Sequence, residues 1–159
     1  MPDLLGQLGE CFQGRLCLMG LGNIDYGDDG LGVRLAKKLV AAGVPDVIVA
    51  GTMPERFIDS AIADDFDYLI FLDAAEFGAP AGSVVFLNAE EMAARFPQIS
   101  THKISLGLLA KLVEEKGKTR AHLLGVQPES LKSTGELSPV VKKTLDILST
   151  MIIELRNNS

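Results

Sequence analysis

The stretch Leu16–Gly32, which reads LCLMGLGNIDYGDDGLG, decides the fold. Its first five residues, Leu16–Gly20, form an apolar run of strand length, and glycines dominate the loop that follows. Leucines then recur at every fourth position, at Leu31, Leu35 and Leu39, which is typical of an amphipathic helix. The stretch therefore predicts a strand that passes through a tight glycine loop into a helix, the first half of a βαβ unit.

The same alternation of short apolar runs and helical patterns continues along the chain. Strand-length runs occur at Leu16–Gly20, Val47–Ala50, Tyr68–Leu72, Val84–Leu87 and Ala121–Gly125. Helical patterns cover residues 31–39, a short segment from about residue 54, and residues 89–96, 104–116 and 138–156. The second, third and fourth runs are continuously apolar, as in strands buried on both faces. We expect an α/β three-layer sandwich, with helices on both faces of a mostly parallel five-stranded sheet in which one edge strand can run antiparallel.

Composition limits the class of protein. The 159 residues fit a single domain over residues 1–159, with residues 1–14 as an N-terminal extension that is either loose or a short added helix. The net charge of −6 argues against nucleic-acid binding, because no cationic excess faces phosphate. No apolar run reaches the roughly 18 residues of a membrane span, and no basic residue precedes Arg15 as in a secretory signal. We therefore expect a cytoplasmic protein.

Two alternative site types fit the sequence poorly. The pattern GxGxxG of a dinucleotide site would place its third glycine at Asp25, and the second strand ends at Ala50-Gly51 without the acid that binds a ribose. The phosphate-loop pattern GxxxxGK[ST] is absent from the sequence. Cys11 and Cys17 match no zinc motif and are expected to be structural, Cys17 as a buried strand residue.

Three polar residues follow strand ends or open helices. Asp29 lies in the first loop, Asp73 directly follows the third strand, and His102 follows Ser100-Thr101, either of which could cap the next helix. Each has an ordinary interpretation as a helix cap, a turn acid or a surface histidine. Because loops at the carboxyl ends of parallel strands share one edge of the sheet, the three side chains are expected to meet.

Two carboxylates and one imidazole form a competent ligand set for nickel, zinc, iron or manganese. Three protein ligands also leave coordination positions open for water or a substrate group. Asp28 or Asp29 is expected to cap the helix after the first loop, and His122, inside a strand pattern, is expected to be structural.

Four segments of the sequence form a series of motifs. They are Gly20–Asn23 with Gly27–Gly32, Leu69–Ala74, Ser100–His102 and Leu124–Glu129. In this series the chain resembles one family, the nickel-iron hydrogenase maturation endopeptidases. The opening signature is the most specific, and the agreement in order and spacing runs from about Leu16 to Ser149. Thr101-His102 and Gln127-Pro128 favour the formate-hydrogenlyase-type branch.

The resemblance implies a cytoplasmic peptidase that removes a C-terminal extension from the large-subunit precursor of a hydrogenase after nickel insertion. Its metal-contacting residues would be Asp29, Asp73 and His102, with nickel held by the protein or presented by the substrate, and with other divalent cations able to substitute. The family often has an acid just before the turn that follows the second strand. This chain has Ala50 there, so no role of that acid is carried over.

From the residues and the resemblance we hypothesise metal-assisted peptide hydrolysis, with Asp29, Asp73 and His102 also as the catalytic residues. Asp28 is the nearest candidate for an auxiliary base or for a residue that supports a ligand. We expect a monomer. The alternative is a non-catalytic chaperone of the same fold that binds metal or precursor without cutting it.

Overall fold

The computed structural model describes residues 3–95 and 105–159. This part of the chain contains six α-helices and five strands, with one 3₁₀ turn, η1, before the second helix. Helices and strands alternate except where β4 follows β3 and α5 follows α4. In order they are α1 (Leu4–Phe12), β1 (Leu16–Leu21), η1 (Gly27–Gly30), α2 (Leu31–Ala41), β2 (Val47–Gly51), α3 (Glu55–Ala63), β3 (Tyr68–Ala74), β4 (Val84–Asn88), α4 (Ala89–Arg95), α5 (Leu106–Lys116), β5 (Arg120–Val126) and α6 (Pro139–Asn157).

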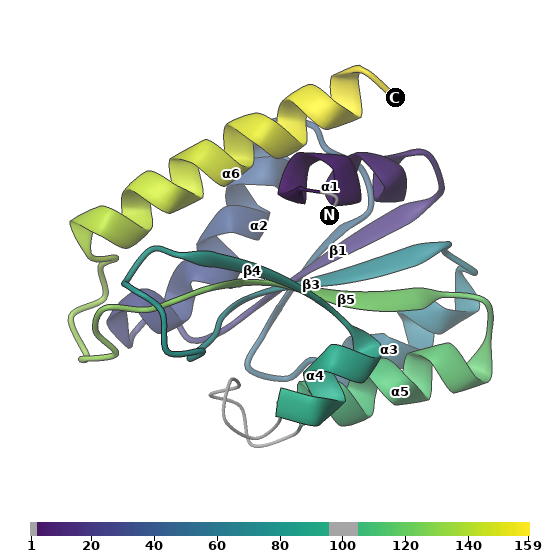
Figure 1. Cartoon of the computed structure of the whole chain (residues 1–159), viewed down its shortest axis with the longest axis horizontal. Helices are drawn as coiled ribbons and strands as arrows, with labels where there is room; N and C mark the ends of the chain where they lie inside the picture. Colours follow the sequence, from purple (N-terminus) through teal and green to yellow (C-terminus); the bar gives the residue numbers. More distant parts are fainter. Residues whose placement is uncertain (1–2, 96–104) are drawn as a thin grey trace.

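The five strands form one sheet in the order β2-β1-β3-β5-β4. All neighbours are parallel except β4, which pairs with β5 in the antiparallel sense at one edge. Helices α1, α2 and α6 lie over one face of the sheet, and α3, α4 and α5 lie over the other (Figure 1). The predicted three-layer α/β sandwich, including an antiparallel edge strand, is confirmed.

The core consists of one apolar layer on each face of the sheet, and β3 contributes to both. Leu69 and Phe71 pack toward α3, α4 and α5, whereas Ile70 and Leu72 pack toward α1, α2 and α6, because successive side chains of a strand point to opposite faces. All four are fully buried, and each burial is worth about 1.5–3 kcal/mol. This central strand places Asp73 at its carboxyl end.

The prediction that three strands are buried on both faces is right for β3 and wrong for the other two. β2 and β4 are the edge strands, and most of their residues are only partly buried. Val49 of β2 remains 36% exposed. A continuous apolar run thus predicts a strand correctly, but it does not distinguish a central strand from an edge strand.

The start of α5 differs from the prediction. The N-cap of α5 is Ser105, whose hydroxyl accepts a hydrogen bond from the Leu108 amide at 3.0 Å, so the expected cap at Ser100 or Thr101 and the start at residue 104 are wrong. Of the two alternatives predicted for residues 1–14, the short added helix is present: α1 follows the N-cap Asp3 and buries Leu8 and Cys11.

Candidate active site

The first loop brings the start of α2 against the carboxyl ends of β1 and β3. Gly22, at φ +122°, donates its amide to the Gly51 carbonyl at 2.9 Å, which ties this loop to the end of β2. A Cβ on Gly32 would collide with the carbonyl oxygens of Leu72 and Leu21. Glycine at position 32 therefore lets α2 touch the end of β3, next to Asp73.

Asp29 lies in η1, at the start of this contact. Its side chain is partly buried, and its Oδ2 accepts a hydrogen bond from the Asn23 amide at 2.9 Å. A Cβ on Gly22 would collide with the Asp29 carbonyl oxygen, so the loop can fold this tightly only around glycine. The loop thus holds the Asp29 carboxylate at the carboxyl edge of the sheet.

Asp73 reaches the same edge from β3. In the register of the sheet it lies opposite Gly125 of β5, and its residue surface is only 1% exposed. An ionised carboxylate in such a position carries a large desolvation cost, which a nearby cation offsets. The structure therefore places both predicted acids at one edge, with Asp73 almost completely removed from water.

Asp28, next in sequence to Asp29, has a different role. It is fully buried, and its carboxylate accepts four hydrogen bonds of 2.7–3.1 Å, from the amides of Glu129, Ser130 and Ser138 and from the Ser138 hydroxyl. A carboxylate with these four donors fixes the loop between β5 and α6. The structure thus favours a structural role for Asp28 over the predicted auxiliary base.

The predicted helix cap by Asp28 or Asp29 is wrong. The N-cap of α2 is Gly30, and no side chain caps the helix there. Asp28 faces the distant segment at 129–138 instead, and Asp29 accepts from the loop at Asn23. The local sequence favoured capping, but long-range contacts determine where both acids point.

Two further residues at this edge were not predicted from the sequence. Arg34 of α2 donates a hydrogen bond to the Gly135 carbonyl, a second anchor for the β5–α6 loop. Gln127 is buried, and its side-chain oxygen accepts from the amides of Phe77 and Ala79 at 2.9 and 3.3 Å. The only sequence signal for Gln127 was its place between the strand end and Pro128.

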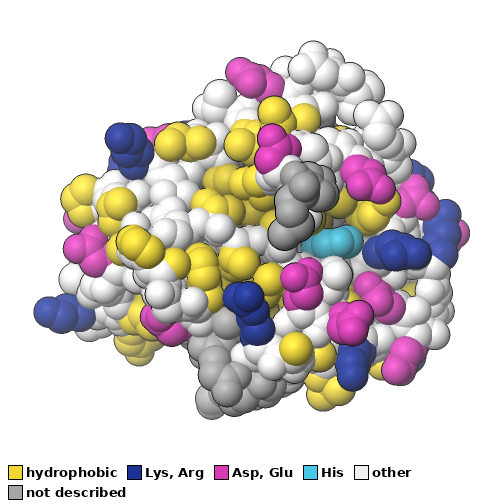
Figure 2. Space-filling model, viewed as in Figure 1, with side chains coloured by type: hydrophobic (Ala, Val, Ile, Leu, Met, Phe, Trp, Pro, Cys, Tyr) yellow, Lys and Arg dark blue, Asp and Glu magenta, His cyan; other side chains and the backbone are white. Residues whose placement is uncertain are grey.

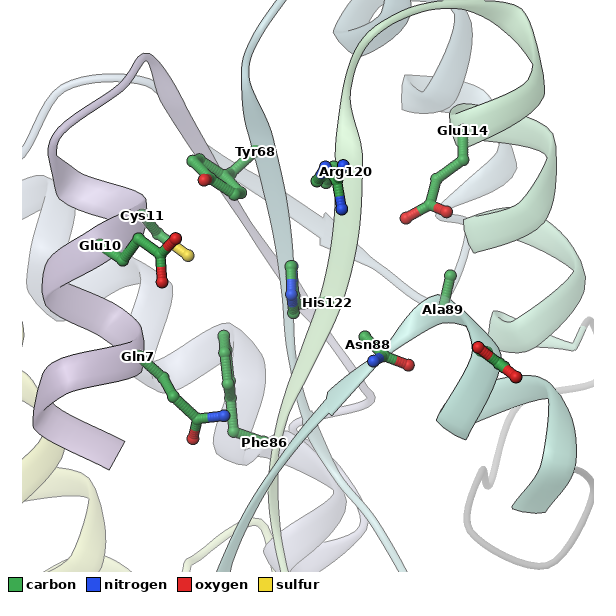
Figure 3. Close-up of a pocket in the computed structure, with 11 residues that line it drawn as sticks. Gln7, Glu10, Cys11, Tyr68, Phe86, Asn88, Ala89, Glu114, Arg120 and His122 are labelled. Carbon is green, nitrogen blue, oxygen red and sulfur yellow. The ribbon is translucent and has the colours of Figure 1, made fainter. Parts of the chain in front are cut away.

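The opposite, amino edge of the sheet carries a hollow of about 580 Å³ between α1 and the ends of β3, β5 and β4. In Figure 2 an imidazole is exposed on this side of the molecule, with several acidic side chains near it. In Figure 3, Gln7, Glu10 and Cys11 enter from α1, whereas Glu114 enters from α5. The hollow is thus separated from Asp29 and Asp73 by the length of the strands.

His122 lies in this hollow as a strand residue. Its ring stacks on Phe86 with centroids 4.9 Å apart, and burial lowers its pKa below the usual value. Its buried Nδ1 has no hydrogen-bond partner in the described part of the chain. Ring packing of this kind agrees with the expected structural role.

The cysteines are poor nucleophiles. Cys17 is fully buried in β1, as predicted, and burial raises its pKa to about 12. Burial likewise raises the pKa of Cys11 to about 11. At neutral pH both thiols are therefore protonated, whereas nucleophilic attack needs the thiolate.

His102 lies outside the described residues, so its place beside Asp29 and Asp73 stays a prediction. Within residues 3–95 and 105–159, no group of three or more histidine, cysteine or acidic side chains could hold a metal ion. The two acids at the carboxyl edge thus supply part of the predicted ligand set. None of the described helices is long and apolar enough to cross a membrane.

Comparison with known proteins finds matches to one protein family. A model of the hydrogenase maturation protease family matches residues 33–155. A putative hydrogenase maturation protease of Methanocaldococcus jannaschii is 27% identical and covers 96% of this chain and 93% of its own. The hydrogenase 3 maturation protease of Escherichia coli K12 is 31% identical over 84% of each chain.

Solved structures agree in fold over nearly the whole chain. The crystal structure of the NiFe hydrogenase maturation protease HycI from Thermococcus kodakarensis matches with a TM-score of 0.84 at 30% identity, covering 96% of this chain and 99% of its own. The solution structure of the endopeptidase HycI from Escherichia coli matches with a TM-score of 0.77 at 26% identity, and the match covers 90% of each chain.

Proposed function

Since the chain belongs to the hydrogenase maturation protease family, we propose that it removes the C-terminal extension of a nickel-iron hydrogenase large-subunit precursor after nickel insertion. Family membership supports a peptidase in hydrogenase maturation. The observation that carries the site assignment is the pair of acids, buried Asp73 and loop-held Asp29, at the carboxyl edge of one sheet. In parallel α/β sheets this edge is the usual place of the chemistry.

The chemistry of the donors fits a divalent cation. Carboxylate oxygens at Asp29 and Asp73, joined by an imidazole nitrogen of His102, would suit nickel or another borderline ion. Bound nickel would polarise the scissile carbonyl or make a water more acidic. The buried position of Asp73 supports this assignment, because a carboxylate removed from water interacts more strongly with a cation than a hydrated one does.

The chain's own residues would orient the reacting groups. The Asn23 amide holds one oxygen of the Asp29 carboxylate, which fixes the direction in which this carboxylate points. β3, fixed on both sides by β1 and β5, positions Asp73. Asp28 and Arg34 immobilise the β5–α6 loop at the same edge, which keeps the site in one geometry.

The processing assay tests this function. Purified protein is incubated with nickel-loaded precursor, and a shortened product is sought by gel electrophoresis and mass spectrometry. We expect cleavage by the wild type and loss of cleavage in Asp29→Asn and His102→Ala, both with cooperative melting. Asp25→Asn, an exposed acid in the same loop, is the matched control and should cleave normally. Binding of intact precursor without any cleavage by the wild type would instead favour the chaperone alternative.

A second experiment distinguishes nickel held by the protein from nickel presented by the precursor, by removing metal from one of them at a time. Protein freed of metal by a chelator and then dialysed is given nickel-loaded precursor, and untreated protein is given nickel-free precursor. Cleavage in the first mixture alone places the required ion in the substrate. Restoration of cleavage only by added nickel places it in the protein. We further propose a cytoplasmic monomer, which sedimentation of the purified protein tests for the oligomeric state.

A further inference from the structure

The exposed large hydrophobic residues fall into two groups. Those at positions 5, 40, 49, 108, 140 and 147 lie in helices or in the edge strand β2. The four others in the described part of the chain lie in loops, and we call them the apolar rim. The rim consists of Ile24, Tyr26, Met53 and Leu131, which are 37%, 49%, 40% and 41% exposed.

The three loops that carry the rim lie side by side. Ile24 and Tyr26 follow β1, Met53 follows β2, and Leu131 follows β5. The hydrogen bond from the Gly22 amide to the Gly51 carbonyl joins the first loop to the second at 2.9 Å. An equally short bond from the Asp28 amide to the Ser130 carbonyl joins the first loop to the third. The rim therefore borders the edge that carries Asp29.

Single exposed apolar residues are ordinary, but loops are usually polar. Here every exposed large hydrophobic residue in a described loop lies in a loop at the carboxyl edge. The loops are also rigidly held, since Asp28 accepts four hydrogen bonds from the segment around Leu131. Exposed apolar and aromatic side chains on a preorganised support are typical of a protein–protein interface.

We propose that the apolar rim is the docking surface for the folded body of the hydrogenase precursor, next to its C-terminal extension. This inference rests on the proposed function. A peptide bond cut at Asp29 and Asp73 must be delivered to the carboxyl edge, and the protein that carries it must lie over the surrounding loops. The rim offers that protein apolar contacts, so the matching surface of the precursor is apolar.

This surface supplies recognition and not chemistry. Tyr26, Met53 and Leu131 are exposed on the loops that surround the acids, and none of them belongs to the proposed ligand set. Their loss should therefore weaken binding of the precursor while leaving the turnover of bound precursor unchanged. Ile24 is left intact in the test, because its Cγ2 lies close to Gly30 and supports the loop.

The test compares the triple variant Tyr26→Ser/Met53→Ser/Leu131→Ser with the wild type. Affinity is measured by interferometry on immobilised unprocessed precursor, and kcat by cleavage at saturating precursor. We expect the dissociation constant to rise at least about 30-fold and kcat to stay within about threefold. Leu5→Ser, at an exposed site on α1 outside the apolar rim, is the matched control and should change neither the dissociation constant nor kcat by more than about twofold. Thermal melting checks that each variant is folded.

An unchanged dissociation constant in the folded triple variant overturns the proposal. So does a loss of kcat at unchanged affinity, because the rim would then act on the reaction itself. A wild type that binds precursor through the rim but never cleaves it contradicts the proposed function and leaves the docking surface standing. Titration of binding thus separates the failure of one proposal from the failure of the other.

Discussion

The two edges of the sheet both carry acidic side chains, but in opposite environments. At the amino edge, Glu10, Glu90 and Glu114 surround a hollow of about 580 Å³ and all are exposed to solvent. At the carboxyl edge, Asp73 is 1% exposed and Asp29 is partly buried. A backbone amide donates to Asp29 at one edge and to Glu114 at the other, so burial and not this hydrogen bond distinguishes the two edges. Solvated carboxylates keep their hydration, whereas a buried one depends on its surroundings for compensation.

In the proposed assignment, the chemistry lies at the closely packed edge and not in the hollow. The amino-edge hollow exists because α1 leaves part of β5 and β4 uncovered, and its acids come from separate helices (Figures 1 and 3). The carboxyl edge is built from close contacts at Gly22 and Gly32 that leave no room for a side chain. Close packing that fixes charged groups is what a catalytic site requires.

The largest expected difference between the edges is in cleavage. Asp73→Asn should reduce kcat/KM for nickel-loaded precursor by at least about a thousandfold, because a neutral amide replaces a proposed ligand. Glu114→Gln at the amino edge should remain within about threefold of the wild type. Thermal melting of both variants checks that each is folded. Comparable activities for the two variants would remove Asp73 from the site.

The next largest effect concerns packing at the carboxyl edge. Gly32→Ala should destabilise the protein by about 3 kcal/mol, because the new Cβ forces α2 away from the end of β3. Gly9→Ala in α1, where the Cβ would meet only the Leu155 side chain at 3.7 Å, should be neutral or stabilising. Urea denaturation measures the free energy of unfolding of both variants. Equal stabilities would show that the contact at Gly32 relaxes freely.

A smaller effect on stability is expected to distinguish Asp28 from its neighbour Asp29. Asp28→Asn should lower stability by about 2 kcal/mol, because an amide cannot accept from all four donors that face it. Asp29→Asn should cost much less stability while abolishing cleavage. For both variants, calorimetry measures the stability and the processing assay measures the cleavage. An Asp28→Asn protein as stable as the wild type would contradict its structural role.

The smallest effect is expected from His122. Burial lowers its pKa, so on acidification below about pH 6.5 the unfolded chain takes up the proton first and the folded state loses stability. Above that pH His122 is neutral in both states, so the folded state keeps its full stability. His122→Gln should therefore show a shallower fall in stability between pH 7 and pH 5, with cleavage at pH 7 unchanged. Parallel stability curves for variant and wild type would show that this histidine does not respond to burial.

Most of the fold was predictable because its signals are local. Every predicted strand and every main helix is present, since apolar runs and helical periodicity are read within a few residues. The exposure of β2 and β4 was not predictable from their apolar runs, because the order of strands depends on contacts between distant segments. The start of α5 was misplaced because three hydroxyl residues compete as caps, and Ser105 is the one used.

The site was predictable only in part. Asp29 and Asp73 share an edge because parallel strands bring their carboxyl ends together. The role of Asp28 was missed because its partners lie about a hundred residues away, at Glu129, Ser130 and Ser138. The third proposed ligand, His102, stays a prediction from the sequence.

Hydrogen–deuterium exchange on the complex of Asp29→Asn with nickel-loaded precursor tests most directly which edge receives the substrate. Our account predicts that precursor slows exchange in residues 21–31, 51–54 and 127–137, while residues 5–12, 84–92 and 112–122 keep the rates of the free protein. Slowed exchange confined to the second set of segments, around His122, would place the substrate at the amino edge and contradict the account.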